Sequence, residues 1–525
     1  MRKQINGLLF FALAVFMVAC NRQSVVVMEL EEAQARSPLQ GIDINARRPA
    51  KQLSDYGLFR DLTKQIPAEG VVSYKLNSSH FADGAKAEHF LFIPEGSKIR
   101  YHAKESLDFP VGSLLVQTLF YLRNARDASS GRRLVETRLL IHQKTGWLAV
   151  PYIWNEDQTD ARRAVVGAKT EVTWLDNEGE KVTHRFVTPN MNQCKQCHSV
   201  NEEVKPIGVT GRNLNLSLSD EGGVINQLDR LVKLGLLEGL ASPGRMEEVL
   251  PQWHQEGSET VNHRARAWLH VNCAHCHNPQ GLAGSTGLDL TFDQDNPQLF
   301  GVYKPPIAAG LGSAGLRFSI EPGKPEKSFL LRRLESTELS VMMPTVGRSL
   351  VDQKGVTLIR EWIGGMEKDA DAEAIALDPM KAFQGALEHK DADLGRELFY
   401  AKYQCSVCHT AEATGGGVVG PNLMAIAERA TPEEILQSIV APNAKVTEGY
   451  ATVTVETSDG EMVSGRVTSE DDQSIVFLRG DGSTQTVQKS VVASREVSEV
   501  SAMPALGGIL SQEEAGALVH FLLSL

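Results

Sequence analysis

The stretch Gln404-Cys405-Ser406-Val407-Cys408-His409-Thr410 places two thiols three residues apart, with an imidazole directly after the second. This spacing is the attachment signature for haem c. On one helical turn Cys405 and Cys408 face the same way, so each thiol can add to a vinyl group of a porphyrin. His409 then projects under the macrocycle as the proximal iron ligand. The stretch therefore predicts a covalently bound haem.

The same five-residue pattern occurs at two earlier places: Cys194-Lys195-Gln196-Cys197-His198 and Cys273-Ala274-His275-Cys276-His277. Three copies of so short a cysteine-rich pattern are not expected by chance. We therefore predict three haems c, each held by the two cysteines of a motif. Their proximal ligands are predicted to be His198, His277 and His409.

Two methionines are predicted to complete the coordination of two of these irons. In small c-type cytochromes a methionine opposite the histidine lies on a loop ahead of the C-terminal helix and is usually followed by proline. Met503-Pro504 precedes a helical pattern at 511–523, and Met343-Pro344 precedes another at 352–363. We expect Met503 to pair with the third motif and Met343 with the second, with Met342 as the alternative to Met343.

Two further expectations concern the surroundings of the histidines. The segment Gly420-Pro421-Asn422-Leu423 resembles a proline loop that hydrogen-bonds the proximal imidazole, so Pro421 is expected behind His409. His275, inside the second motif, is expected to be an exposed spacer.

The first motif lacks an evident sixth ligand. No Met-Pro pair precedes a helix after His198, and Met246 lies in a charged stretch. The candidates are water, a histidine of the β-rich N-terminal segment, or one of His254, His263 and His270. The histidines of the N-terminal segment are otherwise expected to be surface or hydrogen-bonded residues: His80, His89, His102, His142 and His184.

Zinc is the competing interpretation of paired cysteines, because Cys194, Cys197, Cys273 and Cys276 would supply four soft ligands. That interpretation leaves the histidine after each pair unexplained. It also leaves the export signal unexplained.

The N-terminus has the features of a bacterial lipoprotein signal. Basic residues at the start precede an apolar run at 8–18, and a small residue precedes Cys20. We predict that 1–20 is the signal and that Cys20 is lipidated, a plain signal peptide or an uncleaved anchor being the alternatives. Asn21 favours the outer membrane, so we expect an exported lipoprotein that faces the periplasm or the cell surface. The other six cysteines lie in the motifs, which leaves none for a disulfide.

At 525 residues the chain is long enough for several domains, and its net charge of −12 argues against a nucleic-acid partner. The predicted fold class is multidomain α+β. It comprises a β-sandwich-like N-terminal domain, mainly α haem c domains, and a small β-barrel inserted in the C-terminal cytochrome c domain. The predicted divisions are a tether at 21–50, a β-rich domain at 51–189, a haem domain at 190–366, a linker at 367–390, a C-terminal domain at 391–525 and the insertion at about 450–497.

Several motifs resemble an exported diheme c-type cytochrome family with a β-rich N-terminal domain, over about 53–366. They are Asn192–His198, Pro206-Ile207-Gly208, Arg212–Asn215, Arg264–Leu269, Asn272–Pro279, Glu136–Leu140 and Tyr152–Asp157. The resemblance implies two haems in this part. The segment Ser79–Ala85 departs from the family's usual form, so no role passes to His80 or His89. Residues 394–525 separately resemble the cytochrome c domain often attached to exported dehydrogenases.

These observations favour a multihaem electron carrier between exported redox partners, such as a dehydrogenase, a reductase or another cytochrome, anchored to the membrane by lipid. A haem enzyme, peroxidase-like or a small-molecule reductase, is the alternative, and it would use an open sixth position at the first haem. A third possibility is that the β-rich domain binds a partner or carbohydrate through Trp147 or Trp154, although core packing accounts equally for both.

Overall fold

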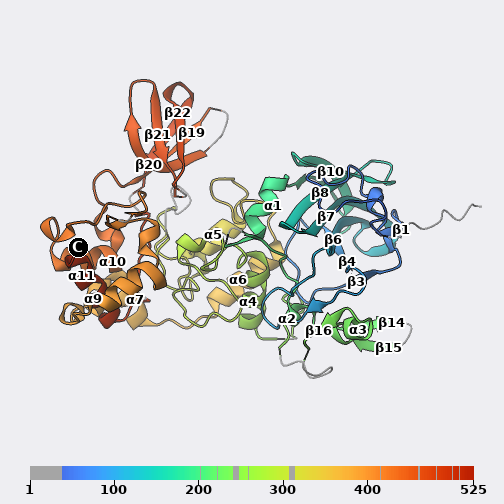
Figure 1. The fold of residues 1–525 in the computed structure, drawn as a ribbon, viewed down its shortest axis with the longest axis horizontal. Coiled ribbons are helices and arrows are strands. Elements are labelled where there is room, and N and C mark those ends of the chain that lie inside the picture. Colours follow the sequence, from blue (N-terminus) through green and yellow to red (C-terminus); the bar gives the residue numbers. More distant parts are fainter. Residues whose placement is uncertain are drawn as a thin grey trace, which may run out of the picture.

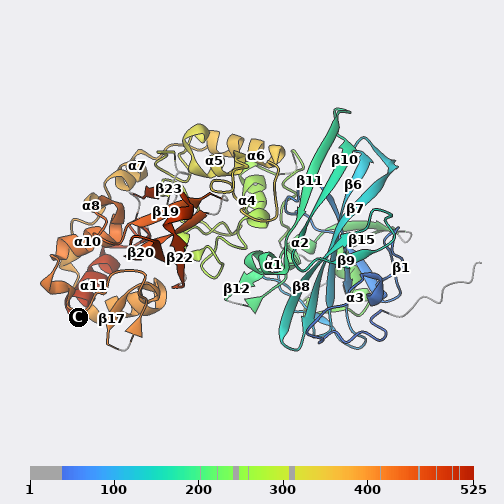
Figure 2. The same ribbon diagram turned by 90° about the horizontal axis from the view of Figure 1, so that it is seen from above.

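The computed structural model describes residues 38–201, 203–220, 223–240, 248–257, 259–306, 314–413, 415–458, 462–480, 482–498, 501–507 and 509–525. These residues form three lobes in a row: an N-terminal lobe up to 240, a central lobe at 248–366 and a C-terminal lobe from 367 (Figure 1). Seen from above, the central lobe lies between the other two (Figure 2). The predicted signal, Cys20 and most of the predicted tether lie outside the described residues.

One eight-stranded sheet dominates the N-terminal lobe. Its centre is the antiparallel meander of β6 (Leu114–Asn124), β7 (Asp127–Gln143) and β8 (Gly146–Trp154). The other strands are β3 (Val71–Tyr74), β4 (Lys86–Phe92), β9 (Ala161–Arg163), β10 (Ala168–Leu175) and β11 (Lys181–Thr188). The main order is β11-β10-β6-β7-β8-β9, and β4 pairs with β6 beside β3. The hairpin expected around 176–179 is the β10–β11 turn.

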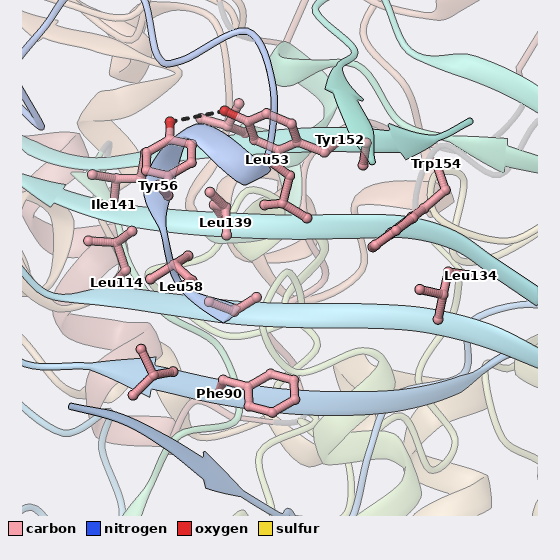
Figure 3. Close-up of a cluster of buried hydrophobic side chains, with 14 of the residues drawn as sticks. Leu53, Tyr56, Leu58, Phe90, Leu114, Leu134, Leu139, Ile141, Tyr152 and Trp154 are labelled. Carbon is pink, nitrogen blue, oxygen red and sulfur yellow. Dashed lines mark hydrogen bonds between the residues drawn. The ribbon is translucent and has the colours of Figure 1, made fainter. Parts of the chain in front are cut away.

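One face of this sheet packs on the segment before β3. Leu53, Tyr56 and Leu58 lie over side chains of β6, β7 and β8 (Figure 3). The hydroxyls of Tyr56 and Tyr152 are 2.9 Å apart in this core. Residues 38–50, assigned from sequence to the tether, also contact it through Leu39, Ile42, Ile44 and Ala50. Trp154 is part of the same core, so it is not a surface aromatic.

The opposite face is covered by residues that follow the first CxxCH motif. Leu228 and Leu231 of α3 (Gln227–Lys233) pack with Leu91 and Leu115 of the sheet. β16 (Leu237–Glu238) also pairs in parallel with β5 (Ile99–Arg100). Residues 211–240 therefore belong to the core of the N-terminal lobe, although they lie within the range assigned from sequence to the haem domain.

The prediction of a β-sandwich is wrong, because a sandwich needs two large sheets packed face to face. In the described residues the large strands of this lobe form a single sheet, and chain segments cover both of its faces instead of a second large sheet. Alternating side chains on β6 serve the two cores, with Leu114 on one face and Leu115 on the other. Local strand patterns cannot distinguish these two ways of burying a sheet.

The central lobe packs three helices around one core: α4 (Val261–Asn272), α5 (Phe329–Glu335) and α6 (Gln353–Gly364). Thr260 and Asp352 cap the first turns of α4 and α6. The indole Nε1 of Trp268 donates to Asp352 Oδ2 at 2.9 Å, which fixes α6 against α4. Long irregular segments connect these helices.

The C-terminal lobe is built on α9 (Ala392–Glu397), α10 (Pro432–Val440) and α11 (Gln512–Leu523). Thr431 caps α10, with Pro432 at its first position, as expected. Gly395 brings α9 against α11, because a Cβ there would lie 2.1 Å from the Ala517 carbonyl oxygen. The range assigned to the linker contains two further helices, α7 (Ala370–Leu377) and α8 (Pro379–Ala382).

The inserted strands form an antiparallel sheet that projects from this lobe (Figure 1). The strands are β19 (Thr452–Thr457), β20 (Met462–Glu470), β21 (Ser474–Leu478), β22 (Thr484–Gln488) and β23 (Val492–Val497). Their order is β22-β21-β20-β19-β23, with β22 and β23 at the two edges. A barrel requires these edges to pair, and within the described residues of the insertion they do not. The expected barrel is therefore wrong, and the described strands form an open sheet.

The predicted fold class is therefore corrected. The chain is α+β, but strands account for 29% of it and helices for 25%, and no large mainly α haem domain is evident among the described residues. The amphipathic patterns in the sequence predicted helices that are present. They gave no indication of the long irregular segments between these helices, so the share of helix was overestimated. None of the helices in the described part of the chain is both long and apolar enough to cross a membrane.

Candidate haem-binding sites

The first motif lies on one short helix, α1 (Met191–His198), beside the N-terminal sheet. The side chains of Asn190 and Gln193 form a capping box that fixes the start of this helix. Its last residue, His198, places Nδ1 2.8 Å from the carbonyl oxygen of Lys205. The two cysteines and the histidine are thus presented from a single turn and a half of helix.

The second motif follows the end of α4. The His277 amide donates to the Cys273 carbonyl at 2.9 Å, which closes the motif into a tight turn. His277 Nδ1 lies 3.2 Å from the hydroxyl of Thr286. That hydroxyl donates its own proton to the Ala283 carbonyl at 2.7 Å, so it accepts from the imidazole.

The third motif has the same closed turn, with the His409 amide 3.0 Å from the Cys405 carbonyl. His409 Nδ1 lies 2.8 Å from the carbonyl oxygen of Pro421, the contact that the sequence predicted for this loop. The loop passes so close that a Cβ on Gly420 would lie 2.6 Å from the imidazole. Only glycine leaves room for the ring there.

The three histidines therefore share one arrangement. Each Nδ1 faces an oxygen acceptor and so carries the proton, which leaves the lone pair on Nε2. Within the described part of the chain no hydrogen bond engages the Nε2 atom of His198, His277 or His409. This is the tautomer that coordinates iron through Nε2, so the donor set fits haem c.

A cavity of 1520 Å³ adjoins the first motif. Cys194, Cys197 and His198 line it, together with His80, Arg138 and Trp147. Its volume exceeds the range of about 300–1,000 Å³ that is usual for one small-molecule ligand. The bond between Arg138 and the fully buried Glu136 is bidentate, with 3.0 Å for each N–O pair, and provides a charged wall.

A second cavity, of 190 Å³, adjoins the second motif. Cys273, Cys276 and His277 line it, and so does Met343, the expected sixth ligand. Met342, the alternative, is only 3% exposed and belongs to the protein interior. The structure therefore places Met343, and not Met342, on the same cavity as His277.

The two cavities share a wall that includes Cys197, His275 and Met343. The Cys276 thiol donates to the carbonyl oxygen of Gln196 at 3.6 Å, so the second motif lies against the first. The expectation that His275 is an exposed spacer is wrong, because its Nδ1 is buried without a hydrogen-bond partner. The first two motifs therefore lie at adjoining cavities.

Arg348 holds the loop that carries Met343. Its Nε donates to the Met343 carbonyl at 2.9 Å, and Nη1 donates to the Leu350 carbonyl at 3.0 Å. Nη2 donates to the carbonyls of Arg333 and Ser336 at 3.1 and 2.9 Å. One buried guanidinium thereby satisfies four backbone acceptors around the loop.

Two cationic side chains line the second cavity. Lys304 is 5% exposed, and burial lowers its pKa to about 8. Arg333 has its Nε buried without a partner among the described residues. Buried cations require an anionic partner. The carboxylates of a porphyrin are of the right charge.

Met503, the expected sixth ligand for the third motif, packs against the same hydrophobic core as that motif. Cys405 and Met503 both pack against the cluster formed by α9, α10 and α11. Gly417 and Gly420 bring the loop after the motif directly onto it. These contacts place the motif and Met503 in one lobe, away from the first two motifs (Figure 1).

The zinc interpretation finds no support in the geometry. Nowhere in the described ranges do three or more histidine, cysteine, aspartate or glutamate side chains converge as a metal site. A Cys₄ centre would need all four cysteines of the first two motifs within bonding reach of one ion.

Sequence reasoning missed Lys205 and Thr286, which closely follow His198 and His277 but belong to no recognisable pattern. It also missed Arg348 and Lys304, which lie further along the chain from the motifs. Only Pro421 could be found, since its loop has a recognisable glycine-proline pattern. No protein-family model matches this chain, and no curated protein is significantly similar to it in sequence.

Proposed function

We propose that this chain is a triheme c-type cytochrome that carries electrons between exported redox partners. The observation that carries the proposal is the shared arrangement of His198, His277 and His409, each with Nδ1 bonded to an oxygen. Three separate chain segments supply these oxygens, which is expected where three imidazoles must each offer Nε2 to a metal.

Bound haem would supply a one-electron iron couple. The residues around each haem would set the potential of this couple. The cysteine pairs would hold the porphyrin, the three histidines would each supply an iron ligand, and Met343 and Met503 would supply a second ligand at the second and third motifs. A methionine opposite histidine favours a high potential and leaves no position for a substrate.

The proposal extends to the predicted lipoprotein signal at 1–20. Covalent haem attachment takes place outside the cytoplasm, and lipidation at Cys20 would hold the lobes at a membrane surface. The partners would be exported dehydrogenases, reductases or other cytochromes, and no nucleic acid is expected at a net charge of −12.

The direct test is the number of covalent haems per mature chain, measured by intact mass and by pyridine haemochrome absorbance. Three haems are expected. A variant with Cys405→Ala and Cys408→Ala should carry two, and the corresponding change at Cys194 and Cys197 should also leave two. Bare thiols in all three motifs, with zinc or no metal bound, would rule out the proposal.

A further inference from the structure

The first motif is the one for which the sequence offers no sixth ligand, and histidines gather around its cavity. The residues are His80, His89, His142, His198, His270 and His275. Three of the five apart from His198 already have other contacts, and a fourth, His275, stands between the two cysteines of the second motif. His89 lies 3.2 Å from Gln117 Nε2, and His270 Nδ1 accepts from the Phe292 amide at 3.2 Å. The His142 ring stacks on Trp147 with centroids 4.4 Å apart.

His80 differs from the others. Its ring has neither a hydrogen bond nor an aromatic contact with any residue in the described ranges, and it is half-buried where it lines the cavity. It lines the same cavity as His198. Burial, followed by the charges of Arg138 and His275, lowers the pKa of His80 to about 3, so the ring is neutral. A neutral imidazole without another partner is available as a metal ligand at the cavity.

The backbone on both sides of His80 is fastened to the central lobe and its neighbours. Before it, Ser78 receives a bond from Trp253 and donates from Oγ to the Pro251 carbonyl at 2.6 Å. Directly after it, the Phe81 amide donates to Asn272 Oδ1 at 2.8 Å, one residue before Cys273.

Asp83, three residues after His80, also ties this segment to the central lobe. Its carboxylate accepts from the amides of Ser349 and Leu350, both at 2.8 Å. These residues follow Arg348, so the same loop is tied to Met343 and to the His80 segment. His80 is therefore held at the cavity by a rigid, preorganised segment, as a metal ligand must be.

We propose that His80 is the sixth ligand of the iron bound at the first motif, opposite His198. The inference rests on the proposed function and refines it, because it makes the first haem bis-histidine, while the other two are histidine–methionine. A filled sixth position leaves no site for peroxide or another small ligand, so the haem-enzyme alternative is disfavoured. A haem without methionine is also expected to have the lowest potential of the three.

The test uses the full-length haem-loaded protein and three variants: His80→Ala, His80→Met and, as the matched control in the same cavity, His142→Ala. Covalent haem is counted by mass, and the spin state of ferric iron is read by electron paramagnetic resonance. The unmodified protein should carry three haems, all low-spin. His80→Ala should keep three haems but convert about one third of the iron to high-spin, and added imidazole should restore the low-spin signal.

His80→Met should remain low-spin, gain a sulfur-to-iron charge-transfer band and show one raised midpoint potential. His142→Ala should match the unmodified protein. The low-spin signals of the other two haems report whether each variant is folded, and His80→Met decides the matter if His80→Ala loses haem.

The inference is overturned if three haems are present and His80→Ala stays wholly low-spin. It is also overturned if the unmodified protein already contains one high-spin haem, or if His142→Ala causes the conversion. Fewer than three haems in the unmodified protein would instead contradict the proposed function, so the two failures are distinct.

Discussion

At the scale of single residues, the sites depend on small groups behind each imidazole. A carbonyl or hydroxyl oxygen at 2.8–3.2 Å holds the ring of each proximal histidine and selects its tautomer. At the third motif a glycine is needed as well, because the loop that supplies the oxygen crosses the ring at van der Waals contact. Changes of a single methyl group are therefore expected to be measurable there.

Gly420→Ala should disturb the third haem. The new Cβ would lie 2.6–2.9 Å from three atoms of the His409 ring, so the ring or the Pro421 loop must move. We expect a loss of about 1–3 kcal/mol in the free energy of unfolding and an altered spectrum for one haem of three. Gly480→Ala is the control, because nothing lies within 4 Å of its added carbon. Equal denaturation midpoints for the two variants would contradict the close contact.

Glu514→Gln should weaken the C-terminal lobe in a pH-dependent way. Burial alone raises the pKa of this carboxyl, but hydrogen bonds from Lys402, the Ser511 amide and Tyr403 outweigh it and leave the pKa below 4.5. The stabilisation from the charged form is therefore complete above pH 4.5 and is lost as the pH falls through the lower folded value.

We expect the Gln variant to lose about 0.5–2 kcal/mol at pH 7, the usual value of an N-cap interaction. The difference from the unmodified protein should shrink in acid. Thermal unfolding between pH 3 and pH 7 measures both effects, with the exposed neighbour Glu513→Gln as the control. A difference that grows as the pH falls would be inconsistent with a lowered pKa.

At the scale of elements, loops and not helices place the ligands. The Met343 loop has no regular structure of its own. The Arg348 guanidinium donates to two carbonyls of this loop, Met343 and Leu350, and to two of a neighbouring segment, Arg333 and Ser336. The His80 segment is tied to the same region through Asp83. Two candidate ligands for two different haems are thereby positioned by one connected set of hydrogen bonds.

Arg348→Lys should release the Met343 loop. An ammonium has three donors on one nitrogen and cannot reach four carbonyls that a planar guanidinium spans. Each buried acceptor left without a partner costs about 1–3 kcal/mol. We expect a weaker sulfur-to-iron charge-transfer band for one haem and a lower thermal midpoint. Arg360→Lys, which keeps a charge beside Glu335 at the surface, should change neither property.

At the scale of the whole molecule, the first two motifs belong together and the third stands apart. The first two come from the N-terminal and central lobes, yet their cavities share a wall, and the Cys276 thiol donates to the Gln196 carbonyl of the first motif at 3.6 Å. The third motif lies within the core of the C-terminal lobe. Two of the haems should therefore interact strongly, and the third should respond mainly to its own surroundings.

Removing the second haem by Cys273→Ala and Cys276→Ala should shift the midpoint potential of the first by tens of millivolts, since neighbouring charges interact at close range. For a one-electron couple about 59 mV corresponds to a tenfold change in equilibrium. Removing the third haem by Cys405→Ala and Cys408→Ala should leave both potentials unchanged. Potentiometric titration of the two variants checks this, and the opposite pattern would contradict the shared wall.

Much of the local structure was predictable because its causes are local. The CxxCH pattern, the Thr431-Pro432 start of α10 and the β10–β11 hairpin each depend on a few consecutive residues. The single large sheet, the open inserted sheet and the small share of helix were not predictable in this way. These features depend on which chain segments cover which faces of the sheets, and the local pattern of apolar residues does not indicate this.

The three CxxCH motifs, and with them the proposed haem sites, can be found from the sequence alone, because covalent attachment needs two thiols and an imidazole within five residues. The groups around each motif depend on how the chain folds. The tertiary structure brought His80 to the first cavity, the Lys205 carbonyl behind His198 and Arg348 behind the Met343 loop. These groups act through space, and chain separation has no fixed relation to distance in a folded protein.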